Sequence, residues 1–146
     1  MSERLFLLDT SVVLFLVRGT VLGQRIDAEY GLRLSKTRPL VSIVSHGEVR
    51  SLAARNGWGE KKLEALEHAL TSLVTVDINH PRVLDAYVTI DVYSQNHSGG
   101  ARNMGKNDLW IAACAKASGA ALLTTDKDYL HLDPDQLSVE WVDPAL

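Results

Sequence analysis

The amino-acid sequence predicts an α/β fold of three layers, in which helices flank a mostly parallel five-stranded sheet. Two features lead to this prediction. Short apolar runs recur along the chain, with longer helix-like segments between them. Two of these runs, residues 5–8 and 120–124, are almost wholly apolar, and an acidic residue follows each within two positions. Runs without alternation are typical of strands buried on both faces, which occur where helices cover both sides of a parallel sheet.

The composition is that of one globular domain spanning residues 1–146. A chain of this length, with 46% hydrophobic residues, buries roughly 68–70% of the surface that its unfolded form exposes. The single cysteine, Cys114, has no partner in the chain, which excludes an internal disulfide and a cysteine-based zinc site and favours a reducing compartment. The first apolar run, residues 5–8, is too short for a signal peptide or a membrane span. We therefore expect a cytoplasmic protein without a membrane contact.

Five apolar runs are expected to form the strands. The first run ends at Asp9-Thr10-Ser11, and the fourth ends in Thr-Thr followed by Asp126. The last run alternates enough to be an edge strand. The expected strands cover residues 4–8, 40–44, 73–76, 120–124 and 137–142.

Helices are expected between these strands. Gly19 ends the first helix, and apolar residues at Ile26, Tyr30 and Leu34 recur every four positions in the second. Asn79-His80-Pro81 starts the fifth, because proline is favoured in a first helical turn. The expected helices cover residues 12–17, 24–34, 45–54, 60–70, 79–96 and 107–117.

The last expected helix is the best defined at its ends. Asn107 is a good N-cap, which places Asp108 in the first turn, and Gly119 supplies the stop. The glycine-rich segment before it, residues 98–105, is expected to be a flexible loop.

Four acids are predicted to meet at one edge of the sheet. Parallel strands all end at the same edge, so the segments that follow the first, second and fourth strands bring Asp9, Glu48 and Asp126 there. Asp108 joins them because its helix begins where the strand that follows it ends. Four carboxylates without compensating bases repel one another, and divalent ions with oxygen ligands, Mg²⁺ or Mn²⁺, resolve this repulsion. Such a site supports in-line hydrolysis of a phosphodiester.

Each acid also has an ordinary structural interpretation. Ser45 and Glu48 match a capping box, which explains Glu48 without a metal. Asp108 could complement the helix dipole, and Asp9 and Asp126 could be turn residues. One acid alone is more often structural than catalytic. Four that arrive at one edge favour a functional site.

The net charge of −3 argues only weakly against a nucleic-acid partner, because the charge is unevenly distributed. Residues 1–58 contain eight Lys and Arg against five Asp and Glu, whereas residues 59–146 contain seven against thirteen. Arg102 and Lys106 lie in or beside the expected flexible loop and are candidates for contacts to RNA phosphates.

Four ordered motifs resemble those of PIN-domain nucleases, and among these the small VapC toxins of toxin–antitoxin pairs. They read Leu-Leu-Asp-Thr-Ser, Ser-x-x-Glu-Val, Gly-x-Asn-Asp-x-x-Ile-Ala-Ala and Leu-Leu-Thr-Thr-Asp-x-Asp-Tyr. The resemblance runs from Leu5 to Trp141, and the Asn-Asp-x-x-Ile-Ala-Ala block is its most specific part. It implies a PIN-like fold and a Mg²⁺- or Mn²⁺-dependent endoribonuclease.

The resemblance also implies roles and partners. The family's metal-binding and catalytic acids correspond to Asp9, Glu48, Asp108 and Asp126. Asp128 matches a frequent further acid, which we expect to support the site without binding the metal, and Ser11 matches a small polar residue that hydrogen-bonds the first acid. A small antitoxin and a homodimer are the implied protein partners. The apolar residues 12–17 are a candidate antitoxin surface, although burial in the core explains them equally well.

Three other functions remain open on the sequence. A housekeeping PIN-type RNA-processing nuclease would have the same acids. A phosphoryl-transfer or receiver-type domain would use Asp9 as a covalent phosphate acceptor, but the sequence lacks the neighbouring acids that such domains need. A non-catalytic binding module is disfavoured because all four expected acids are present.

Overall fold

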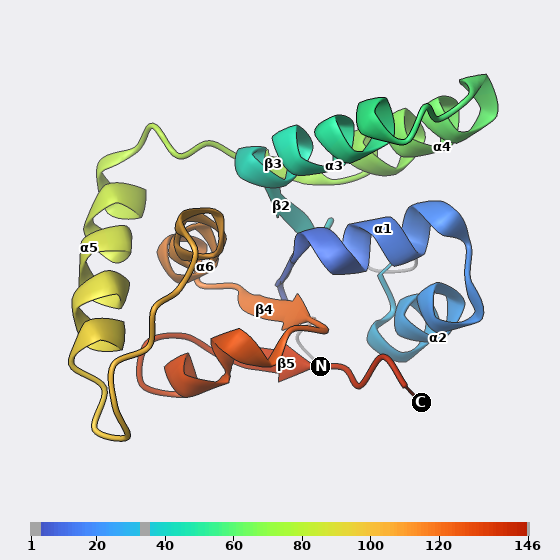
Figure 1. Ribbon diagram of the computed structural model, residues 1–146. Helices are drawn as coiled ribbons and strands as arrows, with labels where there is room; N and C mark the ends of the chain where they lie inside the picture. The colour runs from blue at the N-terminus through green and yellow to red at the C-terminus, as the bar shows by residue number, and fades with distance from the viewer. Residues whose placement is uncertain (1–3, 33–35, 146) are drawn as a thin grey trace.

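The computed structural model describes residues 4–32 and 36–145, and Figure 1 shows their arrangement. The strands are β1 (Phe6–Leu8), β2 (Leu40–Ser42), β3 (Val74–Val76), β4 (Ala121–Thr124) and β5 (Val139–Trp141). The helices are α1 (Thr10–Arg18), α2 (Val21–Tyr30), α3 (Ile43–Arg55), α4 (Glu60–Thr71), α5 (Pro81–Gln95), α6 (Lys106–Ser118) and the 3₁₀ helix η1 (Lys127–Leu132). None of these helices is both long and apolar enough to cross a membrane.

The five strands form one parallel sheet in the order β3-β2-β1-β4-β5. The central strand β1 pairs with β2 on one side and β4 on the other, with Leu7 in register with Leu40 and Leu122. Every residue of β1 and β4 is buried. The prediction of an α/β fold with a five-stranded parallel sheet is therefore confirmed.

The two faces of the sheet are covered by different helices (Figure 1). Phe6 and Leu8 point to one core, which is completed by α1, α2, α4 and the inner side of α3. Leu7 points to the other core, formed with α5, α6 and η1. This alternation within one strand is the period of two that places neighbouring side chains on opposite faces of a sheet.

Two predicted boundaries are wrong in ways that affect the site. The second strand ends at Ser42 instead of continuing to residue 44, because the Ser42 hydroxyl accepts a hydrogen bond from Val44 N and caps α3 there. Ser45 is therefore inside the helix, and the capping box with Glu48 does not form. In α6, Gly105 rather than Asn107 is the N-cap.

The other elements lie close to their predicted ranges. Leu34, which was expected in the second helix, lies outside the described residues. The segment from 96 to 105, between α5 and α6, contains no helix or strand.

Candidate metal-binding site

The four predicted acids stand at the edge where the strands end, each placed by the start of a helix. Asp9 follows β1 and is the N-cap of α1, and Asp126 follows β4 and is the N-cap of η1. Asp108 lies in the first turn of α6, and Glu48 lies in the second turn of α3. Helix starts gather at this edge because a helix next to a parallel strand runs antiparallel to it, so the helix begins where the strand ends.

Asp9 is the most buried of these acids, with 6% of its surface exposed. Its Oδ2 accepts a 2.7 Å hydrogen bond from Thr124 Oγ1, and its Oδ1 accepts one of 2.8 Å from Thr10 N. Burial raises the pKa of Asp9 to about 6, the charges of Asp108 and Asp126 act in the same direction, and the two hydrogen bonds oppose them. The fold thus holds a carboxylate in a place that disfavours its charge.

A buried tyrosine joins two of the acids. The Tyr129 side chain is fully buried, and its hydroxyl oxygen lies 3.0 Å from Asp108 Oδ1 and 3.3 Å from Asp9 Oδ1. A hydroxyl has one hydrogen to donate, so the two carboxyl groups share a single donor. Burial, together with the negative charges of Asp9 and Asp108, raises the pKa of Tyr129 far above its usual range, which keeps this donor protonated.

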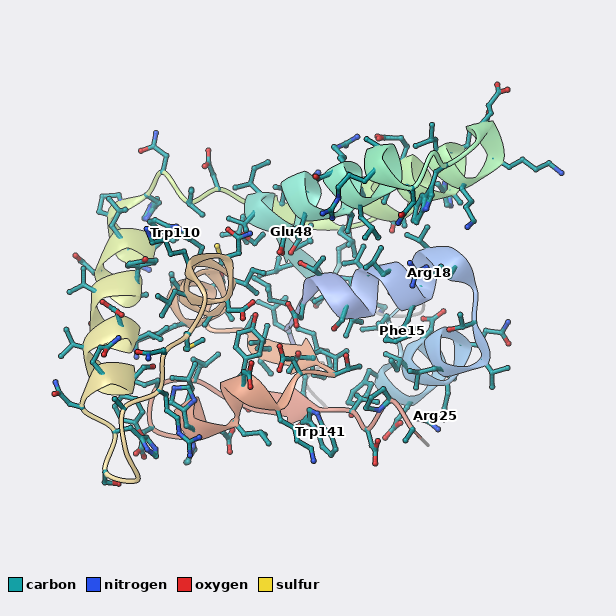
Figure 2. The ribbon with its side chains drawn as sticks, viewed as in Figure 1. Phe15, Arg18, Arg25, Glu48, Trp110 and Trp141 are labelled. Atoms are coloured by element: carbon teal, nitrogen blue, oxygen red, sulfur yellow. The ribbon has the colours of Figure 1, made fainter. Side chains whose placement is uncertain are left out.

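Glu48 belongs to α3 and lies next to the start of α1 (Figure 2). Its Oε1 accepts a 2.6 Å hydrogen bond from Thr10 Oγ1, which also contacts Ser45 Oγ at 2.8 Å. Its Oε2 accepts a weaker bond of 3.3 Å from Asn107 Nδ2. The Glu48 side chain, which belongs to α3, is therefore held in place by hydrogen bonds from α1 and α6.

In the part of the chain that the structure describes, no cation is paired with these acids. Among residues 4–32 and 36–145, no Lys or Arg forms an ion pair with Asp9, Glu48, Asp108 or Asp126. Partial burial raises the pKa of Asp108, and the charges of Asp126 and Glu48 raise it further against the hydrogen bond from Tyr129. Unbalanced negative charge at one edge is what a bound divalent cation would neutralise.

The donors fit Mg²⁺ or Mn²⁺, although the described side chains are not gathered around a single point. All donors are carboxylate oxygens, which these hard ions prefer. Within the described ranges, no three His, Cys, Asp or Glu side chains already form a ligand cluster. Mg²⁺ does not require one, because it keeps several waters and uses one or two carboxylates together with substrate phosphates.

Of the two residues predicted to support the acids, Asp128 contacts one of them and Ser11 does not. Asp128 donates its backbone N–H to Asp126 Oδ1 at 2.9 Å, and its charge contributes to the raised pKa of Asp108. Ser11 accepts a hydrogen bond from Thr125 Oγ1 at 3.0 Å, whereas the bonds to Asp9 come from Thr10, Thr124 and Tyr129.

Arg102 and Lys106 are exposed, and neither has a hydrogen bond or ion pair to any of the four acids. Burial lowers the pKa of His131 in η1, and the charges of His97 and Arg102 act in the same direction.

Four polar residues that hold the acids were not predicted: Thr10, Asn107, Thr124 and Tyr129. All four lie inside the quoted motifs, beside an acid or within three residues of one. That proximity was the only available signal, because the sequence does not show which hydroxyl reaches which carboxylate.

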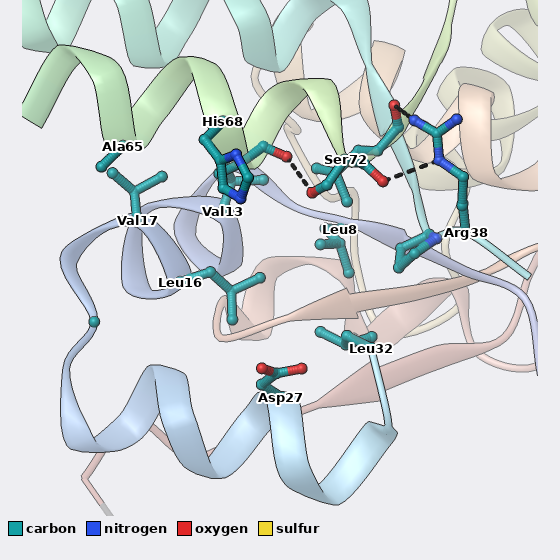
Figure 3. A pocket seen from close by; sticks show the side chains of 14 residues that line it. Leu8, Val13, Leu16, Val17, Asp27, Leu32, Arg38, Ala65, His68 and Ser72 are labelled. Carbon is teal, nitrogen blue, oxygen red and sulfur yellow. Dashed lines mark hydrogen bonds between the residues drawn. The ribbon is translucent and has the colours of Figure 1, made fainter. Parts of the chain in front are cut away.

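A separate cavity of about 480 Å³ lies between α1, α2 and α4 (Figure 3). Its lining is mainly apolar and includes Val13, Leu16 and Val17. At its rim, the Arg38 guanidinium donates hydrogen bonds to the carbonyl oxygens at the end of α4, including a 3.1 Å bond to Ser72. Val12 and Val13 are fully buried, so core packing explains that part of the predicted antitoxin surface.

The fold and the acidic edge together define an α/β protein with four carboxylates at the edge where its parallel strands end. A family model for the PIN domain matches residues 6–133. The chain belongs to the PIN domain family, whose members are typically nucleases and typically bind Mg²⁺. No curated protein matches the sequence significantly.

Solved structures of similar fold come from VapBC and FitAB complexes. The chain is 19% identical to one in VapBC2 from Rickettsia felis bound to a promoter DNA fragment, with a TM-score of 0.75 over 95% of this chain and 99% of that one. It is 25% identical to a chain in FitAcB from Neisseria gonorrhoeae, with a TM-score of 0.71 over 92% of this chain and 96% of that one. It is 22% identical to one in VapBC-5, of the VapBC family of toxin–antitoxin systems, from Mycobacterium tuberculosis, with a TM-score of 0.63 over 97% and 98%.

Proposed function

We propose that this chain is a metal-dependent endoribonuclease and the toxin of a toxin–antitoxin pair. The observation that carries the proposal is the uncompensated set of Asp9, Glu48, Asp108 and Asp126 at one edge of the sheet in a member of the PIN domain family. A single strand of RNA suits such an edge, because its unstacked backbone can approach carboxylates that a duplex would hold at a distance.

The protein's own residues have defined tasks in this proposal. Asp9, Glu48, Asp108 and Asp126 would hold Mg²⁺ or Mn²⁺, and the chemistry supplied by such an ion would be activation of a water and neutralisation of charge on the phosphate. Thr124 and Tyr129 fix Asp9, and Thr10 and Asn107 fix Glu48, so that the carboxylates are oriented before substrate arrives. Preorganised ligands avoid a reorganisation cost during the reaction.

A covalent phosphoryl-transfer role for Asp9 is less well supported. Phosphoryl-transfer domains of this kind need further acids beside the phosphate acceptor. Those acids are missing here, because Asp9 is followed by Thr10, Ser11 and Val12.

The activity is tested with purified protein that has been unfolded, separated from any bound partner and refolded. It should cut single-stranded RNA in Mg²⁺ or Mn²⁺ and stop when EDTA is added. Substitution Asp9→Asn should abolish cleavage. Absence of cleavage by the refolded protein in both metals would contradict the proposal.

The toxin role is supported by the solved structures of similar fold, which are VapBC and FitAB complexes. In this chain, the apolar cavity between α1, α2 and α4 could receive apolar side chains of an antitoxin. Co-purification of a small protein encoded next to this gene would support that role. A chain that is purified alone from its native host and cuts RNA without harm to growth would instead be a housekeeping nuclease.

A further inference from the structure

An open groove of about 600 Å³ begins at Glu48 and leads away from the other acids. It runs along α3, with α1 on its other side and the start of α6 at its acidic end. Its lining residues are Thr10, Leu14, Ile43, Val44, Gly47, Glu48, Ser51, Leu52, Arg55 and Asn107. None of the proposed metal-binding acids except Glu48 contributes to it.

The lining combines three kinds of chemistry. Leu14, Ile43 and Leu52 form apolar surface, and Ile43 is 41% exposed although it is a large aliphatic residue. Thr10 and Ser51 provide hydroxyl groups, and Arg55 provides a cation. A nucleotide has the matching parts, namely a flat base, a ribose with hydroxyl groups and a phosphate.

Gly47 keeps the groove open in the middle of α3. A Cβ at this position would have no atom within 4 Å, so the space beside Gly47 is empty. Glycine lowers the stability of a helix interior relative to alanine. Packing among the described residues does not require glycine here, and the missing side chain leaves this part of the groove wall open.

Arg55 lies seven residues after Glu48 on the same side of α3, which is about 10 Å along the helix axis. Its guanidinium has no hydrogen-bond or ion-pair partner among the described residues. Arg50 of the same helix, in contrast, is paired with Glu67 of α4. Arg55 is thus a free cation at the far end of a groove whose near end is a metal-binding carboxylate.

We propose that this groove binds the nucleotide next to the cleavage point, with the base or ribose beside Gly47 and the flanking phosphate on Arg55. The proposal rests on the ribonuclease function proposed above and assigns that function a substrate subsite. A groove of the same kind could instead be covered by a second protein chain. The free cation and the continuity with the acids favour RNA.

The test uses the full chain and a fluorescein-labelled single-stranded RNA decamer of mixed sequence. Binding is followed by fluorescence anisotropy with Ca²⁺ in place of Mg²⁺, and a gel confirms that the RNA remains intact. Cleavage is measured separately in Mn²⁺. The variants are Gly47→Ala, Gly47→Met and Arg55→Gln, and Arg50→Gln is the matched control that removes a cation from α3 outside the groove.

Substitutions at Arg55 and at Gly47 should affect RNA binding in different ways. Arg55→Gln should weaken binding about 5-fold to 10-fold and reduce the slope of log K against log salt by about 0.7, the value for one phosphate contact on a single strand. Gly47→Met should weaken binding at least as much without changing that slope, and Gly47→Ala should have a smaller effect. Gly47→Ala should also raise the melting temperature by roughly 2 °C, which separates lost binding from lost folding.

Three results would overturn the proposed subsite, and they differ in whether the proposed nuclease function also fails. If the wild type cuts RNA and the Gly47 and Arg55 variants bind and cut like the Arg50→Gln control, the subsite is wrong and the nuclease remains. If the wild type neither binds nor cuts RNA, the proposed function fails and the subsite fails with it. If Gly47→Met changes the mass of the particle in solution while RNA binding is unaffected, the groove is a protein interface.

Discussion

The hydroxyl of Tyr129 lies 3.0 Å from Oδ1 of Asp108, although the two residues are 21 positions apart and belong to different helices. The same oxygen contacts Asp9 at 3.3 Å. The acid after the central strand and the acid at the start of α6 are therefore connected through one buried side chain. In our account this contact keeps the two carboxyl groups adjacent for a divalent ion.

Substitution Tyr129→Phe should lower the affinity for Mn²⁺ about 10-fold, because residues that orient metal-binding carboxylates typically contribute 10-fold to 100-fold. Calorimetric titration with Mn²⁺ measures this affinity, and the phenylalanine ring should keep the core intact. The matched control is Tyr93→Phe, which removes a tyrosine hydroxyl bound to Asp135 on the surface. Equal Mn²⁺ affinity in both variants would show that the Tyr129 hydroxyl has no role in the site.

Ser42, and not the pair of Ser45 and Glu48, should stabilise the start of α3. Substitution Ser42→Ala removes the observed cap and should cost about 1 kcal/mol, which corresponds to roughly 2–4 °C in melting temperature for a protein of this size. Glu48→Ala should change the melting temperature by less than this. Thermal unfolding in EDTA measures both, and a Glu48→Ala loss as large as that of Ser42→Ala would restore the capping interpretation.

The metal-free protein should become less stable as the pH rises from about 4 to about 6. Asp9 binds its proton with a pKa of about 6 when folded, against an ordinary value of 3.8. The folded state therefore binds more protons than the unfolded state in this range, so its advantage is complete below about pH 4 and is lost above about pH 6. The raised pKa of Asp108 acts in the same direction.

Asp9→Asn isolates this contribution. A difference of about two pKa units corresponds to roughly 3 kcal/mol, so the variant should be more stable than the wild type at pH 7 in EDTA by up to about that amount. Urea unfolding at pH 4, 5, 6 and 7 measures the free energy of unfolding of both proteins. Parallel pH profiles would mean that Asp9 is not the buried charge described here.

The arrangement of the four acids could be predicted from the sequence because it depends on the direction in which the strands and helices run. Once the runs ending at Leu8 and Thr124 are recognised as parallel strands, Asp9 and Asp126 must emerge at the same edge. The capping of α3 was predicted wrongly because Ser42 and Ser45 are both plausible caps in sequence. The choice depends on where the pairing of β2 with its neighbours ends.

The contacts that hold the acids could not be predicted in the same way. Tyr129 reaches Asp9 and Asp108 from η1, which packs against β5 and α5, and no periodicity of the sequence encodes that packing. The groove beside Gly47 has a similar origin. It depends on the separation of α1 and α3, which is set by the packing of both helices on the core.

If the carboxylates at the sheet edge hold the ion with which RNA is cut, removing the charge of one of them must slow cleavage, and the cleavage rate of Asp108→Asn measures this effect. This substitution keeps the size of the side chain and its ability to accept a hydrogen bond from Tyr129, but it removes the charge. Asp85→Asn, which changes an exposed acid of α5, is the matched control. We predict that Asp108→Asn cuts single-stranded RNA in Mn²⁺ at least about 100-fold more slowly than the wild type, while Asp85→Asn cuts at the wild-type rate. Equal rates for wild type and Asp108→Asn would contradict the account.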